Sequence, residues 1–516
     1  MGSRMSTETT LRDLLSSGEQ GAAALSATSV PDLTYGELRG QLAETDAALR
    51  RIGIGANDRV AIVLPNGPEM ATAFLAVAST AACAPLNPGY RSEEFEFYLS
   101  DLGAKALIVE AGSTSPAIDV ARKKGVAILT LCPRPQRGAG SFSLETSGIS
   151  LGAPQPERTA APDDIALVLH TSGTTSRPKI VPLSQRNLCA SAKNIRRTCA
   201  FTPADRGLNI MPLFHIHGLI AAVLAPLSAG SSVFCTPGFN ALRFYGWMEM
   251  VQPTWYTAVP TMHQMVLARA RHHEATIAAH RLRFIRSSSS ALPRAVITAM
   301  ESTFRLPVIE SYGMTEATHQ MASNLLPPGI RKPGTVGPAA GPEIAIMDES
   351  GNLLAAGITG EVVIRGENVT KGYENNPKAN AEAFVNGWFR TGDLGTQDPD
   401  GYVSITGRLK EIISRGGEKI SPREIDEVLM DHPAVLQVVT FGIPHDKLGE
   451  EVGAVVVLRE GMSVTEIELR AFVAERVAEF KVPRKLLFMD EIPKGATGKL
   501  QRIGLAAKLG LGSRIS

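Results

Sequence analysis

The chain has 516 residues, enough for a large core and for more than one domain. A hydrophobic content of 44% and a charged content of 20% are typical of a globular protein, and a net charge of +1 provides no general attraction to nucleic acid or to an anionic membrane. The five cysteines are odd in number and form no C-x-x-C pair, which favours reduced thiols over a disulfide framework.

Segments of strand-like and helical pattern alternate through the first 320 residues. The predicted strands are 60–64, 106–109, 165–169, 232–235, 256–259, 282–286 and 308–311, and the predicted helices include 69–79 and 92–102. This alternation predicts an α/β domain in which helices cover mostly parallel sheets. The polar stretch 133–163, rich in Pro, Gly and Ser, is interpreted as a surface loop of this domain.

The pattern changes from about residue 343. Strand signals separated by turn residues, at 343–347, 361–365 and 402–405, predict a small barrel-like antiparallel subdomain. The last hundred residues predict a small α+β unit with helices at 422–430 and 464–479 and strands at 435–442 and 452–458. We place the boundary at the charged junction 407–410, which gives an N-terminal domain of residues 1–409 and a C-terminal domain of residues 410–516.

No secretory signal is expected, because the first 30 residues are polar and lack a continuous apolar core. The apolar stretch 219–227 is too short for a membrane span and contains Pro226. The default expectation is a cytoplasmic protein, monomeric or homodimeric, with no nucleic-acid or membrane partner.

Residues 171–179 read Thr-Ser-Gly-Thr-Thr-Ser-Arg-Pro-Lys and directly follow a predicted strand. Backbone N–H groups of such a loop can surround an anion, while hydroxyls add donors and Lys179 adds a point charge. The loop therefore predicts a nucleoside triphosphate as substrate. It is not a Walker loop, because the pattern G-x-x-x-x-G-K-[ST] is absent.

Further motifs follow along the chain. The sequence Tyr-Gly-Met-Thr-Glu at 312–316 offers a ring for a base, a hydroxyl for a phosphate and a carboxylate for Mg²⁺. Asp393 offers a carboxylate for ribose, and Arg408 lies at the proposed junction. The segment 493–502 places Lys499 in a loop bracketed by glycines near the C-terminus.

With these motifs in this order, the chain resembles the acyl-adenylate-forming (ANL) superfamily of acyl-CoA synthetases, luciferases and adenylation domains over nearly all of its length. The resemblance implies a large nucleotide-binding N-terminal domain and a small mobile C-terminal domain that rotates between two half-reactions. It also implies ATP, Mg²⁺ and coenzyme A as cofactor and substrates.

The same resemblance implies roles for individual residues. The implied catalytic residues are Lys499, Thr315, Glu316 and His215, with Glu316 also serving the metal and Lys410 as the hinge. The implied ATP and AMP site consists of Thr171, Ser172, Gly173, Thr174, Thr175, Lys179, Ser289, Ser290, Ala291, Glu310, Ser311, Tyr312, Gly313, Met314, Thr315, Asp393, Arg408 and Lys499. The implied coenzyme A site consists of Arg415, Gly416, Gly417 and Lys419.

Within the superfamily the sequence resembles the oxalate–CoA ligases most closely, in the stretches 94–101, 170–179, 314–319 and 415–422. The predicted acid pocket is polar and consists of His215, His217, Ser289 and His319. A long alkyl tail would leave these groups unpaired, at about 1–3 kcal/mol each. We therefore predict oxalate as the acid; malonate or another short or medium-chain acid is the alternative. His217 and His319 also admit a purely structural interpretation.

Two other functions are considered. Residues 148–152 match the G-x-S-x-G pattern of a serine hydrolase around Ser150, but a nucleophile elbow needs a strand before the serine and a helix after it. A non-catalytic nucleotide-binding scaffold is disfavoured by the presence of Lys179, Glu316 and Lys499. Ile180 stands where the family usually has glycine, which predicts an ordinary backbone conformation there.

Overall fold

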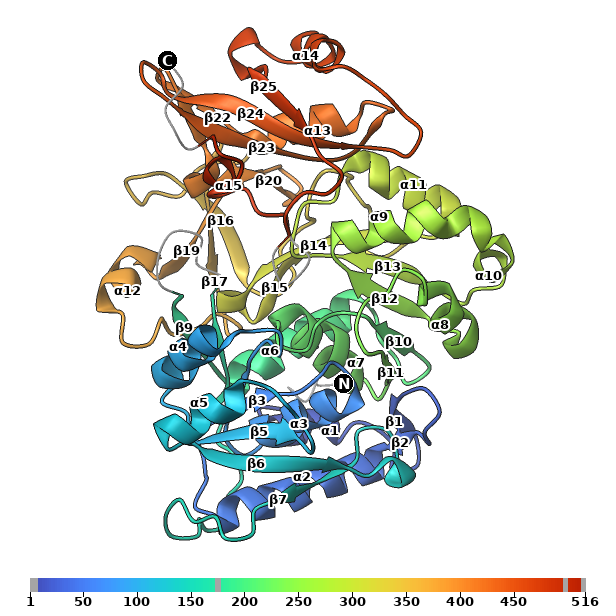
Figure 1. The fold of residues 1–516 in the computed structure, drawn as a ribbon, viewed down its shortest axis with the longest axis vertical. Coiled ribbons are helices and arrows are strands. Elements are labelled where there is room, and N and C mark those ends of the chain that lie inside the picture. Colours follow the sequence, from blue (N-terminus) through green and yellow to red (C-terminus); the bar gives the residue numbers. More distant parts are fainter. Residues whose placement is uncertain (1–7, 172–177, 495–499, 512–516) are drawn as a thin grey trace.

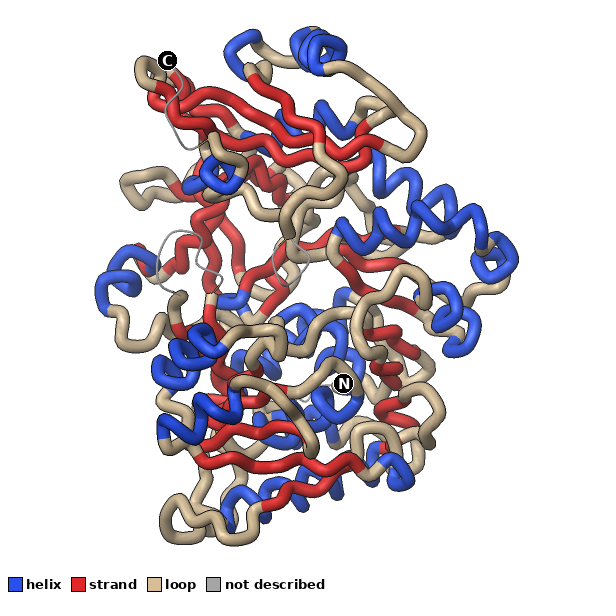
Figure 2. Tube along the Cα trace, in the orientation of Figure 1, coloured by secondary structure: helices blue, strands red, loops and turns tan. Residues whose placement is uncertain are grey.

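The computed structural model describes residues 8–171, 178–494 and 500–511. These residues form two large sheets, of seven and eight strands, and two five-stranded sheets (Figures 1 and 2). No helix within the described ranges has the length and apolar character that crossing a membrane requires.

The seven-stranded sheet is parallel apart from its two edge strands, β7 and β9. Its strands, in spatial order, are β7 (Phe142–Glu145), β6 (Ala127–Pro133), β5 (Ala106–Glu110), β3 (Arg59–Val63), β4 (Ala82–Pro85), β8 (Ile165–His170) and β9 (Ile180–Ser184). Strand β7 corrects the prediction of a surface loop at 133–163. It pairs with β6 and buries Phe142 against the core.

The eight-stranded sheet is also mostly parallel, with antiparallel pairs only at its two ends. Its strands, in spatial order, are β15 (His319–Ser323), β14 (Val308–Met314), β13 (Phe284–Ser287), β12 (Trp255–Ala258), β10 (Arg206–Asn209), β11 (Ser232–Cys235), β1 (Ala23–Ser26) and β2 (Leu33–Thr34). The predicted α/β class with mostly parallel sheets is therefore confirmed.

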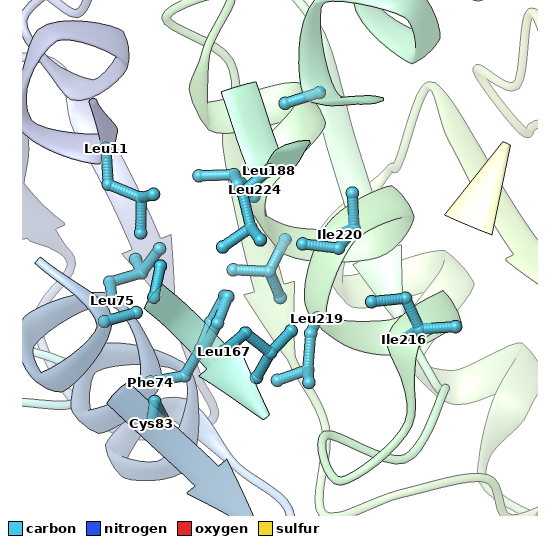
Figure 3. Close-up of a cluster of buried hydrophobic side chains, with 14 of the residues drawn as sticks. Leu11, Phe74, Leu75, Cys83, Leu167, Leu188, Ile216, Leu219, Ile220 and Leu224 are labelled. Atoms are coloured by element: carbon cyan, nitrogen blue, oxygen red, sulfur yellow. The ribbon is translucent and has the colours of Figure 1, made fainter. Parts of the chain in front are cut away.

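A layer of buried helices joins the two large sheets. Figure 3 shows Phe74 and Leu75 of α3, Leu188 of α6 and Leu224 of the π-helix η2 around Leu167 of β8. These side chains are buried on all sides, because each helix contacts a sheet and a neighbouring helix. The bounds of these helices are Pro68–Ala78 for α3, Gln185–Thr198 for α6 and His217–Leu224 for η2.

Helix α7 (Ala225–Leu227) continues η2 within this buried layer. The other helices of the large domain lie around these sheets (Figure 1). They are α1 (Leu11–Leu15), α2 (Tyr35–Arg51), α4 (Ser92–Leu102), α5 (Ala117–Lys124), α8 (Phe244–Val251), α9 (Pro260–Arg269), α10 (Glu274–Ala278) and α11 (Arg294–Phe304). The residues at the first turn determine where several of these helices begin. The Thr34 hydroxyl and the Glu37 side chain form a capping box at the start of α2, and Ser184 and Asn187 do the same for α6.

Strands β16 to β20 form the predicted barrel-like antiparallel subdomain. They are β16 (Glu343–Met347), β17 (Gly360–Arg365), β18 (Phe384–Val385), β19 (Trp388–Gln397) and β20 (Val403–Arg408), with α12 (Pro377–Ala383) beside them. The short helix η5 (Leu409–Glu411) then leads into the last unit of the chain.

In the part that the structure describes, the last unit is a mixed five-stranded sheet with three α-helices and one short 3-10 helix. Its elements are β21 (Ile413–Arg415), β22 (Glu418–Ile420), α13 (Pro422–Met430), β23 (Val435–His445), β24 (Gly449–Leu458), α14 (Glu466–Ala474), β25 (Lys485–Phe488) and α15 (Leu505–Lys508). It lies against α9 of the large domain, where the Gln264 amide donates to the Leu436 carbonyl at 3.3 Å and accepts from the Gln437 amide at 3.1 Å.

Candidate active site

The loop predicted to bind polyphosphate leaves the carboxyl end of β8 and returns as β9. The Thr171 N–H donates to the Lys179 carbonyl at 3.0 Å, and the Lys179 N–H donates to Thr171 Oγ1 at 3.2 Å, so the two ends of the loop are held together. The predicted residues Ser172, Gly173, Thr174 and Thr175 lie outside the described residues. Ile180 begins β9 with an ordinary backbone conformation, as predicted.

Lys179 and Glu316 come from different predicted motifs and are joined through Tyr373, which the sequence did not indicate. The Lys179 Nζ lies 4.1 Å from the centroid of the Tyr373 ring, a cation–π contact. The Tyr373 hydroxyl donates to Glu316 Oε1 at 2.7 Å. Burial raises the pKa of Glu316, whereas the Tyr373 hydrogen bond and the Lys179 charge oppose this rise.

Glu316 fits the metal role that the resemblance implies. Mg²⁺ in nucleotide sites is commonly held by one or two carboxylates together with substrate phosphates. Glu316 supplies one carboxylate beside Thr315, and the described residues contain no group of three or more His, Cys, Asp or Glu side chains that could hold a metal ion. The side chains here therefore suit an ion that arrives with the nucleotide.

Tyr312, Asp393 and Arg408 meet where β14 of the large domain contacts β19 and β20 of the antiparallel subdomain. Asp393 and Arg408 lie opposite each other on β19 and β20, and Arg408 Nε donates to Asp393 Oδ1 at 2.7 Å. The Tyr312 hydroxyl donates to the other oxygen, Oδ2. Burial, the Asp393 charge and this hydrogen bond raise the pKa of Tyr312, which stays neutral. Three residues predicted separately are thus brought together at one buried carboxylate.

Glu310 lies two residues before Tyr312 on β14 and is buried. The Leu292 N–H donates to Glu310 Oε1 at 3.4 Å, while Oε2 has no hydrogen-bond partner among the described residues. Burial raises the pKa of Glu310 to about 7, and the Arg423 charge opposes this rise. A buried carboxyl oxygen without a partner can bind a polar edge of a ligand.

The other predicted nucleotide contacts surround this strand. Ser311 Oγ donates to the Ser287 carbonyl at 3.3 Å, Met314 is half-buried, and Ser290 and Ala291 are exposed. Gly313 is sterically required, because a Cβ there would lie 1.7 Å from the His319 carbonyl oxygen. The close approach of β14 and β15 therefore depends on glycine at this position.

The predicted acid-pocket residues His217, Ser289 and His319 lie together. His217 Nδ1 lies 3.1 Å from Ser289 Oγ, and its Nε2 lies 2.7 Å from Thr257 Oγ1. The His217 and His319 rings stack with centroids 4.8 Å apart and an interplanar angle of 20°. Both rings are buried. His319 is the first residue of β15 and has an unusual positive φ of 93°.

Arg286 on β13 completes this cluster, and the sequence reasoning missed it. Its Nη1 lies 3.2 Å from His319 Nε2 and donates to Thr257 Oγ1 at 3.4 Å, while Nη2 donates to Gln320 Oε1 at 3.2 Å. The side chain is fully buried, and burial lowers its pKa to about 10, so it remains charged at pH 7. The sequence feature that could have indicated it is a charged arginine within the predicted strand 282–286.

His215 lies two residues before His217 and accepts a hydrogen bond from the His217 N–H at Nδ1, at 3.3 Å. It lines a cavity with Thr315, the other predicted catalytic residue. Phe214 and His170 belong to the same lining, so the cavity lies directly beside the start of the 171–179 loop. The structure thus places His215 between the predicted phosphate and acid sites.

The residues predicted to bind coenzyme A lie in the β21–β22 hairpin. Arg415 forms a bidentate ion pair with Glu451, at 2.5 and 3.0 Å, so its charge is already compensated. The Lys419 Nζ donates to Ser414 Oγ at 2.8 Å. The turn consists of Gly416 and Gly417, with φ values of 58° and 95°.

The predicted hinge and the catalytic lysine lie elsewhere in the last unit. Lys410 is exposed in η5, immediately after β20. Lys499 lies outside the described residues, and the flanking Lys494 and Leu500 form an isolated antiparallel bridge. The structure therefore brings together the predicted residues of the large domain and leaves the position of Lys499 undescribed.

Known proteins resemble this chain in both sequence and fold. The model of the AMP-binding enzyme family matches residues 17–374, and that of the AMP-binding enzyme C-terminal domain matches residues 424–499. An oxalate–CoA ligase of Arabidopsis thaliana is 46% identical over 484 residues, covering 93% of this chain and 94% of that protein. An oxalate–CoA ligase of Saccharomyces cerevisiae is 42% identical over 480 residues, covering 89% and 88% of the two chains.

The fold comparison is equally extensive. The crystal structure of ATP-bound MatB from Rhodopseudomonas palustris superposes with a TM-score of 0.87 at 30% identity, covering 98% of this chain and 99% of that chain. The sequence motifs, the two matched family models and this shared architecture lead to one assignment. The chain belongs to the AMP-binding enzyme family, the acyl-adenylate-forming acid–CoA ligases.

Proposed function

We propose that this enzyme ligates oxalate to coenzyme A in two half-reactions, with AMP and pyrophosphate as by-products. In the first, an oxalate carboxylate attacks the α-phosphorus of ATP and pyrophosphate leaves. In the second, the coenzyme A thiolate attacks the carbonyl of the acyl-adenylate and AMP leaves. The observation that carries the choice of acid is the polar cluster of half-buried Ser289 with the buried rings of His217 and His319.

This cluster favours a short and strongly anionic acid. An alkyl chain in contact with these polar groups would leave buried donors unpaired, whereas a second carboxylate can accept from them. Two relatives at 46% and 42% identity carry the name oxalate–CoA ligase, which supports the same choice. Malonate, one methylene longer, is the alternative.

In the first half-reaction an anion attacks an anion, so catalysis depends on placing positive charge and donors around the α- and β-phosphates. We assign Lys179 and the 171–179 loop to the leaving phosphates, and Lys499 to the charge that develops at the α-phosphate. Removing a group of this kind typically lowers the rate about 10²–10³-fold. Thr315 and His215 border the same cavity and can orient the reacting groups. Bound at Glu316, Mg²⁺ would supply charge neutralisation of the phosphates.

The nucleoside is assigned to the other contacts of the large domain. Asp393 is expected to accept from the ribose hydroxyls, with Arg408 holding it in place through the 2.7 Å hydrogen bond. Tyr312 offers its ring to the base, and the partnerless oxygen of Glu310 offers a hydrogen-bonding group to the edge of the base. The family resemblance suggests these roles, and the contacts among Tyr312, Asp393 and Arg408 support them.

The second half-reaction does not need Lys499. We propose that residues 410–516 move as one domain about Lys410, which is exposed in η5 immediately after β20. Such a rotation would replace Lys499 by the β21–β22 hairpin, whose Gly416, Gly417 and Lys419 would border the pantetheine arm. Because Arg415 is paired with Glu451, we assign it to the stability of the hairpin as well as to the edge of this site.

All five cysteines are free thiols, which supports a cytoplasmic enzyme; a monomer or homodimer is proposed. The hydrolase alternative is not supported. Residues 146–164 contain no helix, so Ser150 lacks the strand–turn–helix setting of a nucleophile elbow.

The test is a panel of acids with ATP, Mg²⁺ and coenzyme A. We expect pyrophosphate release and thioester formation with oxalate at a kcat/KM at least about 10-fold above that with malonate, because one methylene in a fitted pocket is worth about 1–3 kcal/mol. Acetate and octanoate serve as controls of similar reactivity and different shape. Absence of oxalate-dependent pyrophosphate release would contradict the proposal, and a preference for malonate would replace oxalate by its homologue.

A further inference from the structure

Arg286 is a buried cation with an unusual set of partners. Within the described ranges, no carboxylate lies within 4.0 Å of its guanidinium, and its partners are Thr257, His319 and Gln320. Its Nε is buried without a hydrogen-bond partner. A buried guanidinium ordinarily requires a paired anion, because removal of a charge from water is strongly unfavourable. The large domain thus contains a positive charge that no described side chain compensates.

The direction of each hydrogen bond around Arg286 follows from its chemistry. A guanidinium can only donate, so His319 Nε2, at 3.2 Å from Nη1, must be the acceptor. This fixes His319 as the neutral tautomer with its proton on Nδ1. Thr257 Oγ1 also accepts from Arg286 and lies 2.7 Å from His217 Nε2, so its own proton is available to that nitrogen. With Thr257 as the donor, His217 carries its proton on Nδ1 and donates to Ser289 Oγ at 3.1 Å.

With this tautomer of His217, one chain of donors runs outward from the guanidinium to the predicted acid pocket. It passes through Thr257 and His217 to Ser289, whose hydroxyl proton is left to point away from His217. The stacked His319 ring forms a second, shorter path. Every group along both paths presents its hydrogen-bond donor on the side away from Arg286. A pocket polarised in this way binds anions and disfavours acceptor-poor or cationic groups.

We propose that Arg286 is a positioning residue that makes the acid pocket selective for a dicarboxylate. It acts through His319 and through Thr257, His217 and Ser289, and it supplies the positive charge that a second substrate carboxylate compensates. This inference rests on the proposed function, because it concerns the acid that the enzyme adenylates. It assigns the discrimination between a dianion and a monoanion of equal size to a residue that does not itself contact the substrate.

The matched pair of ligands is oxalate and its half-amide oxamate, which have nearly the same shape and differ by one negative charge. For the wild-type enzyme we expect a higher kcat/KM for oxalate. In Arg286→Met, kcat/KM for oxalate should fall about 10–100-fold, mainly through KM, since a hydrogen bond to a charged group is worth about 1.5–3 kcal/mol. The value for oxamate should change about 3-fold or less, so the ratio between the two acids collapses.

Three further variants keep the result interpretable. Arg286→Lys retains the charge and should restore part of the oxalate preference. Thr257→Val keeps the shape of the side chain, removes one donor path, and should shift the ratio in the same direction by a smaller factor. Arg283→Met is the control, because Arg283 is on the same chain segment but pairs with Asp205 at 2.8 Å, away from the pocket. The KM for ATP and the melting temperature report general damage.

The outcomes separate this inference from the proposed function. Equal losses for oxalate and oxamate, or an unchanged ratio in both Arg286→Met and Thr257→Val, would overturn the role of Arg286. If the wild-type enzyme uses malonate instead of oxalate, the proposed acid is wrong, and the same ratio is measured with malonate and malonamate. If the wild-type enzyme uses monocarboxylates alone, both proposals fail.

Discussion

Glu310 is a carboxyl group whose protonation state changes near neutral pH because it is buried. Its pKa is raised from 4.5 to about 7, so the folded chain holds this proton more tightly than the unfolded chain does. The resulting contribution to stability is fully present below pH 4.5 and is lost as the pH rises to about 7. Arg423 and Glu427 of α13 are the charges that face it.

We therefore predict that Glu310→Gln removes a pH-dependent part of the stability. The free energy of unfolding of the wild type, relative to the variant, should decrease by about 3 kcal/mol between pH 4.5 and pH 8, since one pKa unit corresponds to about 1.4 kcal/mol. Chemical unfolding of both proteins across this range provides the measurement. The comparison cancels other groups, such as buried His263, whose pKa is lowered to about 4 and whose effect has the opposite sign. Parallel curves for the two proteins would contradict the prediction.

The residues missed by the sequence reasoning share a physical cause. Arg286 and Tyr373 act through long-range contacts, the first across β13 to His319 and the second between Lys179 and Glu316. Neither lies in a motif of its own, and which side chains meet across two sheets is set by tertiary packing. By contrast, Asp393 and Arg408 were predicted from motifs, and their pairing follows from the register of β19 and β20.

Among the elements, the segment after Lys499 packs Leu505 and Ala506 against β23 and β24 and is also held by one arginine. Arg502 donates from Nε to Glu411 at 3.0 Å and from Nη2 to Asp426 at 2.8 Å, and Nη1 donates to the Thr440 carbonyl. It therefore ties the end of the chain to α13, to β23 and to the residue next to the proposed hinge. Burial raises the pKa of Asp426, and the Arg502 charge opposes this rise.

We expect Arg502→Met to destabilise the C-terminal unit by about 3–5 kcal/mol, because it leaves Asp426 buried without its cation. Calorimetry or a fluorescence melting curve should show an earlier transition, and lower pH should partly reverse the loss by protonating Asp426. Arg476→Met is the control, since Arg476 forms an exposed pair with Glu475. An equal, small effect of both substitutions would indicate that the Arg502 network contributes little to stability.

The helices and strands were largely predictable where the hydrophobic periodicity and the residues that start or end an element agreed. The helix predicted at 92–102 is α4 with the same bounds, and Gly103 ends it with a φ of 57°. The helix predicted at 464–479 is shorter: α14 spans Glu466–Ala474, because the Thr465 capping box fixes its start and the following residues turn toward the separate helix η6 (Glu479–Lys481). Helical period alone did not reveal this break.

At the scale of the whole molecule, the proposed cycle separates two active arrangements of one chain. Lys499 is assigned to the first half-reaction alone. We predict that Lys499→Ala lowers the rate of acyl-adenylate formation about 10²–10³-fold, while a preformed acyl-adenylate still reacts with coenzyme A at a rate close to that of the wild type. Pyrophosphate exchange measures the first step, and thioester formation from synthetic acyl-adenylate measures the second.

Lys494→Ala is a suitable control for this separation, because Lys494 lies five residues earlier and pairs with the exposed Glu491. Its two half-reactions should both stay within about 3-fold of the wild type, as expected for the loss of an exposed ion pair. Equal losses of both half-reactions in Lys499→Ala would mean that the lysine serves both arrangements, and the proposed division of labour between them would be wrong.

The π-helix η2 affects how the predicted acid pocket can change during evolution. Its i→i+5 hydrogen bonding accommodates one more residue per turn than an α-helix would, and His217 is its first residue. A single-residue deletion within 218–224 could restore an ordinary helix and would turn His217 by about 100° relative to the residues that follow. The ring would then leave the stack with His319 while the sheets stay in place. In alignments of relatives, a one-residue gap here should accompany a change of acid more often than a substitution does.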